Sequence, residues 1–153
     1  MSLHIKSLSE EAVLQCAAHS EMLDPRDLHA WQRDGGEAVA LGAYEDDQLV
    51  GVLLARTGLE GTLCTTLTVD DPGGTHVTPY SLLLALAESL PEAVKSHCQF
   101  VLRRADLSVR QAIEMFGGWP RSPQAGEDPD AWCAALSEER IERCRTPVKS
   151  MLG

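Results

Sequence analysis

Three strand-like segments follow one another between residues 38 and 69, and no other part of the sequence limits the possible folds so strongly. Residues Ala38–Ala43 and Leu49–Ala55 are apolar, and the polar turn Tyr44–Gln48 joins them, which is typical of a β-hairpin. A second turn at Gly58–Gly61 leads into Thr62–Val69, which is rich in threonine and leucine. We therefore expect three consecutive antiparallel strands.

The residues before these strands predict one strand and two short helices. Residues 3–8 alternate between apolar and polar, as in a half-buried strand. Ser7 and Glu10 have the spacing of a capping box, which predicts that a helix begins there. Asp24 followed by Pro25 combines an N-cap residue with a proline at the first helical position, and predicts a second helix.

Two helices and one strand are expected after the three strands. Thr78-Pro79 repeats the cap-then-proline pattern, and the broad apolar face that follows predicts a helix. Pro91 either ends or kinks this helix, and Ala93-Val94 are expected to continue it for one turn. Gln99–Arg103, with Phe-Val-Leu at its centre, is predicted to be a short buried strand. Ser108 and Gln111 form another capping-box pattern and predict a helix that Gly117-Gly118 ends.

The C-terminal residues have two interpretations. Ala131–Cys144 fits a helix capped by Asp128 or Asp130. Alternatively, Ala131–Leu136 and Ile141–Val148 fit two strands joined by a turn. The pattern of apolar residues leaves both open.

Length and charge limit the classes of partner. The 153 residues predict a single domain over residues 1–153, without a linker long enough to separate two. Thirteen basic and 23 acidic residues give a net charge of −10, which repels phosphate backbones and anionic lipids. We expect no nucleic-acid and no membrane partner; the charge either attracts a cationic or amine-bearing substrate or serves solubility alone. No secretory signal or membrane-spanning stretch is recognised, so we expect a cytoplasmic protein.

The five cysteines indicate neither disulfides nor a metal site. They are widely spaced and include no C-x-x-C pair, so reduced thiols are expected. His97-Cys98 is the one adjacent pair of metal-ligand types, and nothing near it in the sequence completes a zinc set.

The order of expected elements resembles the GNAT N-acetyltransferase superfamily. The hairpin Ala38–Leu54, with its acidic turn and Val50-Gly51, looks like the family's second and third strands. Thr62–Leu84 looks like the fourth strand and the cofactor-binding helix, and Asp106–Trp119 looks like a later helix that ends in glycine and an aromatic residue. The resemblance implies an α/β fold: a mixed, mostly antiparallel, twisted sheet of about six to seven strands with helices on both faces.

The resemblance also implies an acetyl-CoA site. In this family, backbone N–H groups after the fourth strand and at the next helix N-terminus bind the pyrophosphate. The family pattern Arg/Gln-x-x-Gly-x-Gly is not kept, because Gly74, Val77 and Pro79 stand at its Arg and last two Gly positions. Val77 adds bulk and Pro79 lacks a donor, so a turn that binds nothing is the alternative. The implied cofactor residues are Val69, Gly73, Gly74, Thr75, His76, Val77, Thr78, Tyr80 and Ser81.

Catalysis in this family needs a base, often a glutamate on the central strands, and an acid, often a tyrosine on the helix after the fifth strand. Neither stands at its usual place in this sequence. The candidate catalytic residues are therefore substitutes: Asp70 at the end of the fourth strand, Tyr80 at the start of the cofactor helix, and Glu114. Their alternatives are a solvated strand end, a packed aromatic and exposed helix surface.

Three functions follow from the resemblance. The first is acetyl-CoA-dependent transfer of an acetyl group to a small amine. The second is a catalytically inactive module that binds a protein or a metabolite. The third is a homodimer subunit, because tail strands in this fold often pair across subunits. Arg103-Arg104 either meets a nucleotide phosphate or faces solvent at a strand end.

Overall fold

A computed structural model describes residues 3–19, 23–33, 37–58, 61–70, 77–89 and 97–137. Strands and helices follow one another along these residues in the order β1-α1-α2-β2-β3-β4-α3-β5-α4-β6-β7. Their bounds are β1 Leu3–Ser7, α1 Glu10–His19, α2 Pro25–Arg33, β2 Glu37–Glu45, β3 Gln48–Gly58, β4 Gly61–Val69, α3 Val77–Ser89, β5 His97–Leu102, α4 Leu107–Met115, β6 Trp119–Arg121 and β7 Trp132–Ser137.

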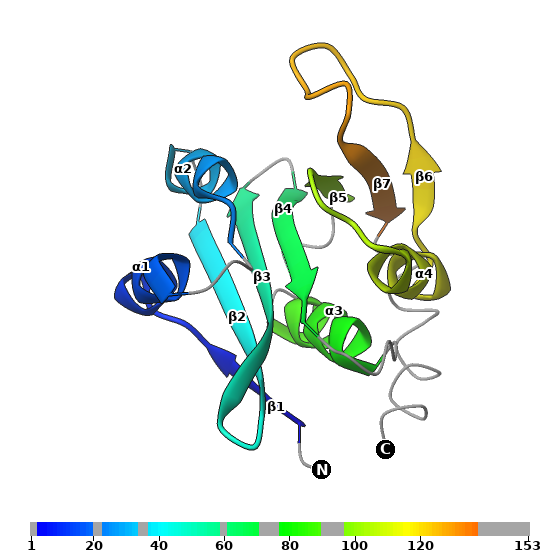
Figure 1. Cartoon of the computed structure of the whole chain (residues 1–153). Coiled ribbons are helices and arrows are strands. Elements are labelled where there is room, and N and C mark those ends of the chain that lie inside the picture. Colours follow the sequence, from blue (N-terminus) through cyan, green and yellow to red (C-terminus); the bar gives the residue numbers. More distant parts are fainter. Residues whose placement is uncertain are drawn as a thin grey trace.

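The strands form one seven-stranded sheet in the order β1-β2-β3-β4-β5-β7-β6 (Figure 1). Neighbouring strands are antiparallel except for β4 and β5, which are parallel and are connected through α3. The predicted mixed, mostly antiparallel sheet is therefore confirmed, and β2, β3 and β4 form the predicted three consecutive strands.

The β2–β3 hairpin has a tighter turn than the predicted Tyr44–Gln48. Asp46 and Asp47 alone make the turn, with φ of 51° and 66°. Positive φ at both central residues is the geometry of the two-residue turns whose twist matches that of paired strands. The flanking residues Tyr44 and Glu45 therefore stay in β2, and both strands are longer than predicted.

Two helix caps differ from the prediction. The hydroxyl of Ser9, not Ser7, accepts the Ala12 N–H at 3.1 Å and caps α1. Asp106, not Ser108, caps α4, because its carboxylate accepts the Val109 N–H at 3.0 Å. In both cases a neighbouring residue of similar chemistry takes the N-cap. None of the described helices is long and apolar enough to cross a membrane.

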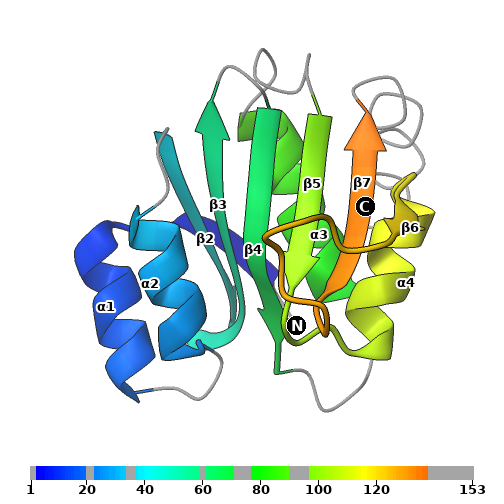
Figure 2. The ribbon, with the colours of Figure 1, turned by 90° about the horizontal axis from the view of Figure 1, so that it is seen from above.

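The helices cover both faces of the sheet and enclose two apolar cores. On one face, here called the α2 face, Val13 of α1 and Leu28 and Trp31 of α2 pack on sheet residues such as Val52 and Leu54. On the opposite face, the α3 face, side chains of α3 and α4 pack on Leu53, Leu67, Phe100 and other sheet residues. Figure 2 shows α1 and α2 in front of the sheet and α3 behind it.

The tail joins the sheet as a strand. Trp132–Ser137 forms β7, which pairs with β5 on one side and β6 on the other, so a helix over these residues is wrong. Alternate residues of β7 enter the core of the α3 face, among them Ala134 and Leu136. The other strand of the predicted hairpin, Ile141–Val148, lies outside the described residues.

Candidate functional site

The parallel strands β4 and β5 pair along only part of their length. Pairing runs from Gly61 opposite His97 to Cys64 opposite Phe100. β4 continues to Val69 and β5 to Leu102 without further pairing between them. The carboxyl ends of these strands therefore separate. In open sheets with parallel strands, ligands bind at such carboxyl ends.

A bulge in β4 lies where the two strands separate. Leu54 pairs with Thr66 and the next residue, Ala55, pairs with Cys64, so Thr65 is the extra residue. The Cys64 thiol donates a hydrogen bond to the Thr66 carbonyl oxygen at 3.3 Å. The hydroxyl oxygens of Thr65 and Thr66 are buried and have no hydrogen-bond partner among the residues that the structure describes. The bulge thus places two unpaired donor–acceptor groups at the candidate site.

The N-terminus of α3 lies close to the sheet. The methyl group of Thr78 is so close to Gly51 on β3 that a side-chain carbon at Gly51 would lie 3.0 Å from it. The first turn of α3 contains no acidic residue, and the N–H groups of its first residues have no partner within the helix. A helix start of this kind attracts phosphate groups. The start of α3 is therefore a candidate site for an anion.

The predicted cofactor residues fall into two groups. Gly73, Gly74, Thr75 and His76 lie outside the described residues. In the other group, the side chains of Thr78 and Tyr80, in the first turn of α3, are buried. Val77 is 45% exposed, and its carbonyl oxygen accepts the Ser81 hydroxyl at 2.8 Å. Val69 packs at the edge of the core.

The predicted catalytic residues lie in different environments. Tyr80 is buried in the core, where its hydroxyl contacts Met115 Sδ of α4, and burial raises the pKa of this phenol. Asp70 follows β4 with an exposed side chain and donates its N–H to the Val50 carbonyl at 2.8 Å. Glu114 is exposed on α4. Tyr80 is thus held by packing, whereas the two carboxylates face solvent.

An ionic bridge that the sequence did not reveal spans the α2 face. Arg103, at the end of β5, contacts Asp27 of α2 at 2.8 Å and Asp128 of the β6–β7 loop at 3.4 Å. Asp27 is 8% exposed; burial, reinforced by the nearby Asp24 carboxylate, raises its pKa despite Arg103. Arg103 therefore binds two carboxylates, which neither sequence interpretation of it anticipated. The available signal in the sequence was Asp27, a carboxylate on the same face of α2 as Leu28 and Trp31.

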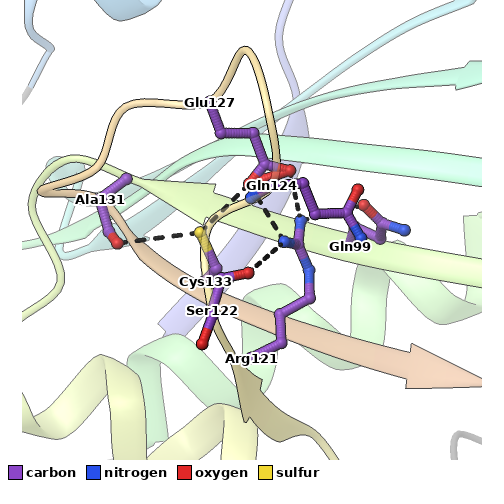
Figure 3. Close-up of polar contacts among 7 residues, drawn as sticks. All are labelled: Gln99, Arg121, Ser122, Gln124, Glu127, Ala131 and Cys133. Carbon is purple, nitrogen blue, oxygen red and sulfur yellow. Dashed lines mark hydrogen bonds and ion pairs between the residues drawn. The ribbon is translucent and has the colours of Figure 1, made fainter.

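A second polar network holds the β6–β7 loop to the sheet (Figure 3). The Arg121 guanidinium makes two hydrogen bonds to Glu127, at 2.8 and 3.1 Å, and one to Gln99 of β5 at 3.1 Å. The Cys133 thiol donates to Glu127 at 3.4 Å. The hydrogen bonds to Arg121 lower the pKa of Glu127, and burial raises that of Cys133.

Comparison with known proteins gives matches only at the level of three-dimensional structure. No family model and no curated protein matches the sequence. Among solved structures, the PaiA N-acetyltransferase from Thermoplasma acidophilum, in complex with coenzyme A, is 15% identical, with a TM-score of 0.60 over 90% of this chain and 99% of that one. The ribosomal-protein-S18-alanine N-acetyltransferase from Escherichia coli is 14% identical, with a TM-score of 0.64 over 88% and 93%.

A third neighbour, the IAA acetyltransferase from Bacillus cereus, is 13% identical, with a TM-score of 0.64 over 88% of this chain and 99% of that one. These matches cover nearly the whole length of each neighbour. The chain therefore has the GNAT N-acetyltransferase fold, as the order of its elements predicted.

Proposed function

We propose that this protein is an acetyl-CoA-dependent N-acetyltransferase that transfers an acetyl group directly to a small amine. The proposal rests chiefly on the separation of β4 from β5 beyond Cys64 and Phe100, beside the first turn of α3. The structural neighbour from Thermoplasma acidophilum, which has this fold, is in complex with coenzyme A. We place the donor at this separation, with its pyrophosphate at the α3 N-terminus.

The chain's contribution to donor binding is a set of backbone donors. We assign the amides of Val77, Thr78 and Tyr80, together with residues 73–76, to the phosphates. Bound acetyl-CoA supplies the thioester whose acetyl carbon is transferred. Backbone N–H groups of β4 beyond Cys64, which no longer pair with β5, are the donors that we assign to the thioester carbonyl oxygen.

The acceptor must reach the thioester as a neutral amine, and the leaving thiolate must gain a proton. We assign the proton to Tyr80, whose phenol is protonated at neutral pH and has its pKa raised further by burial. Asp70, at the end of β4, is our candidate for the base, with Glu114 as the second candidate. The net charge of −10 attracts an amine, which is a cation before it loses its proton.

Calorimetry with acetyl-CoA and with CoA tests the donor site. We expect dissociation constants in the micromolar range. Val77→Asp puts a negative charge in the first turn of α3, where it stabilises the helix but repels phosphate, and should weaken binding about tenfold or more. Val77→Asn is the matched neutral control and should bind as the wild type does. An absence of binding at millimolar CoA would defeat the proposal.

Turnover is tested by thiol release from acetyl-CoA with polyamines, amino acids and aminoglycosides as acceptors. Tyr80→Phe keeps the packing of the ring and removes the proton donor, so thiol release should fall about 100-fold. An unchanged rate would remove Tyr80 from the mechanism without affecting the donor site.

The second candidate function is a catalytically inactive GNAT-fold binding or dimerisation module. It is favoured by the contact of the Tyr80 hydroxyl with Met115 and by the bulk of Val77 at a glycine position of the family motif. Under this proposal the protein binds a protein or a metabolite, or forms a homodimer, and releases no thiol from acetyl-CoA. The thiol-release assay separates the two functions, because turnover contradicts an inactive module, and sedimentation velocity tests for the homodimer.

A further inference from the structure

Thr66 carries a buried hydroxyl at the point where β4 separates from β5. The residue is 2% exposed, and its oxygen has no hydrogen-bond partner within the described part of the chain. A buried hydroxyl without a partner is unfavourable, because it loses its hydrogen bonds to water and gains none. Valine has nearly the same shape and would avoid this cost. A hydroxyl here is therefore better explained by a group that it meets during function.

The strand register shows which side of the sheet Thr66 faces. It pairs with Leu54, and side chains directly opposite each other on antiparallel strands share a face. Leu54 packs in the core beneath α1 and α2, so Thr66 lies on the α2 face. The two residues nearest in sequence whose side chains enter the opposite core are Cys64 and Leu67. Thr66 is thus separated by the sheet from the helix whose N-terminus we assign to the donor.

Asp27 adds a carboxylate to the same face. It lies on the buried side of α2, and α2 packs against β3 and β4. Its ion-pair partner Arg103 is itself partly exposed, with 33% of the side chain accessible. Both a hydroxyl and a carboxylate can accept hydrogen bonds from the N–H groups of an ammonium ion.

We propose that Thr66 is an acceptor-binding residue whose hydroxyl oxygen accepts a hydrogen bond from a primary amine that enters from the α2 face. This inference rests on the proposed function. The donor lies towards α3, and the amine attacks the thioester carbon from the other side of the sheet. The acceptor arrives as a primary ammonium ion, displaces Arg103 from Asp27, and gives one proton to Asp70, the candidate base. The neutral amine then attacks the thioester carbon, so that the C–N bond forms and the C–S bond breaks, and the nitrogen loses its second proton to water. The thiolate leaves with the electron pair of the C–S bond.

A stability measurement tests whether the Thr66 hydroxyl has a structural role. Thr66→Val removes the hydroxyl and keeps the shape, and Thr66→Ser keeps the hydroxyl. Thr62 is the matched control, because it is on the same strand, is 3% exposed, and bonds Thr57 through its hydroxyl at 3.2 Å. Thr62→Val should lower the urea midpoint, since it leaves Thr57 unpaired, whereas Thr66→Val should leave the midpoint unchanged or raise it.

Binding is tested by NMR of the protein labelled at threonine methyl groups and saturated with CoA. The two valine variants assign the Thr62 and Thr66 signals. Titration with n-butylammonium chloride should shift the Thr66 methyl signal saturably and leave the Thr62 signal in place. In the acetylation of n-butylamine, Thr66→Val should lower kcat/KM for the amine about tenfold or more and leave the KM for acetyl-CoA unchanged. Thr66→Ser should retain most of the activity.

The outcomes distinguish this inference from the proposed function. If CoA binds but the Thr66 signal does not move, Thr66 does not contact the amine. If Thr66→Val destabilises the protein as Thr62→Val does, the hydroxyl has a structural partner. Either result overturns the inference and leaves the donor site intact. If CoA does not bind, the proposed function fails first.

Discussion

Arg121 connects three segments of the chain through one side chain. Its guanidinium bonds Glu127 in the β6–β7 loop, Gln99 on β5 and the carbonyl oxygen of Ser122. Arg121 and Glu127 are 13% and 19% exposed, so water screens this pair only weakly. Pairs with two parallel hydrogen bonds are stronger and more directional than single contacts. The network therefore fixes the loop over β5.

Glu127→Gln should destabilise the protein by about 1–3 kcal/mol at pH 7, because it leaves the half-buried Arg121 charge without its counter-charge. The hydrogen bonds from Arg121 lower the pKa of Glu127 in the folded protein. The ionised carboxylate therefore stabilises the wild type fully at pH values above the ordinary glutamate pKa of about 4.3. This stabilisation is lost as the pH falls through the lower pKa of the folded state. The variant should lack the part of the acid-induced loss of stability that comes from protonation of Glu127. Urea denaturation between pH 3 and pH 7 measures both effects.

The exposed Glu37 provides the control for this prediction. Glu37→Gln should change stability by less than about 0.5 kcal/mol, with the acid dependence of the wild type retained. Equal effects of the two substitutions would mean that the Arg121–Glu127 pair contributes nothing specific.

At the level of elements, the β4–β5 pair depends on a glycine at its start. Gly61 has a φ of +129°, and a side-chain carbon there would lie 2.1 Å from the His97 carbonyl oxygen of β5. Gly61 pairs with Gly58 across the β3–β4 hairpin, where an added carbon would meet nothing within 4 Å. There is therefore room for a side chain at Gly58 but none at Gly61, which faces it.

Gly61→Ala should therefore lower the free energy of unfolding by at least about 2–3 kcal/mol, through backbone strain and the displacement of β5. Gly58→Ala should change it by less than about 0.5 kcal/mol. Thermal unfolding of the two variants side by side tests this, and a similar fall in Tm for both would contradict the close approach of His97 to Gly61.

The elements that were predicted from sequence are those specified by local patterns. Two apolar segments joined by an acidic turn sufficed for the β2–β3 hairpin, and the cap-then-proline pattern at Asp24-Pro25 sufficed for α2. The small apolar residues of Trp132–Ser137 fit both helix and strand, and only pairing with β5 decides between them. Caps were placed wrongly where two polar residues stand close together, as with Ser7 and Ser9.

At the level of the whole molecule, the sequence predicted where the candidate site lies, but not which side chains face it. Sequence order located the end of β4 and the start of α3, because the connection between them is short. The bulge at Thr65 and the facing of Thr66 depend on the register with β3, which the sequence does not encode locally. Likewise, Asp27, Arg103 and Asp128 are far apart in the sequence and meet only because the sheet brings α2, β5 and the β6–β7 loop together.

Arg103→Gln tests this long-range bridge. Asp27 would lose its nearest cation while it remains buried, so stability should fall by about 1–3 kcal/mol at pH 7. Burial raises the pKa of Asp27 in the folded protein. The protonated Asp27 carboxyl therefore contributes most to stability below the ordinary aspartate pKa of about 3.9, and this contribution is lost as the pH rises through the folded-state pKa. Without Arg103 that folded-state pKa should rise further. The difference in stability between variant and wild type should therefore shrink between pH 7 and pH 4.5, because a protonated Asp27 needs no counter-charge.

Arg104→Gln removes an equal charge from the adjacent exposed residue, and its difference from the wild type should not shrink in this way. Urea denaturation of the wild type and the two variants at both pH values measures these free energies of unfolding. If Arg103→Gln loses the same stability at both pH values, the charge of Asp27 does not depend on Arg103.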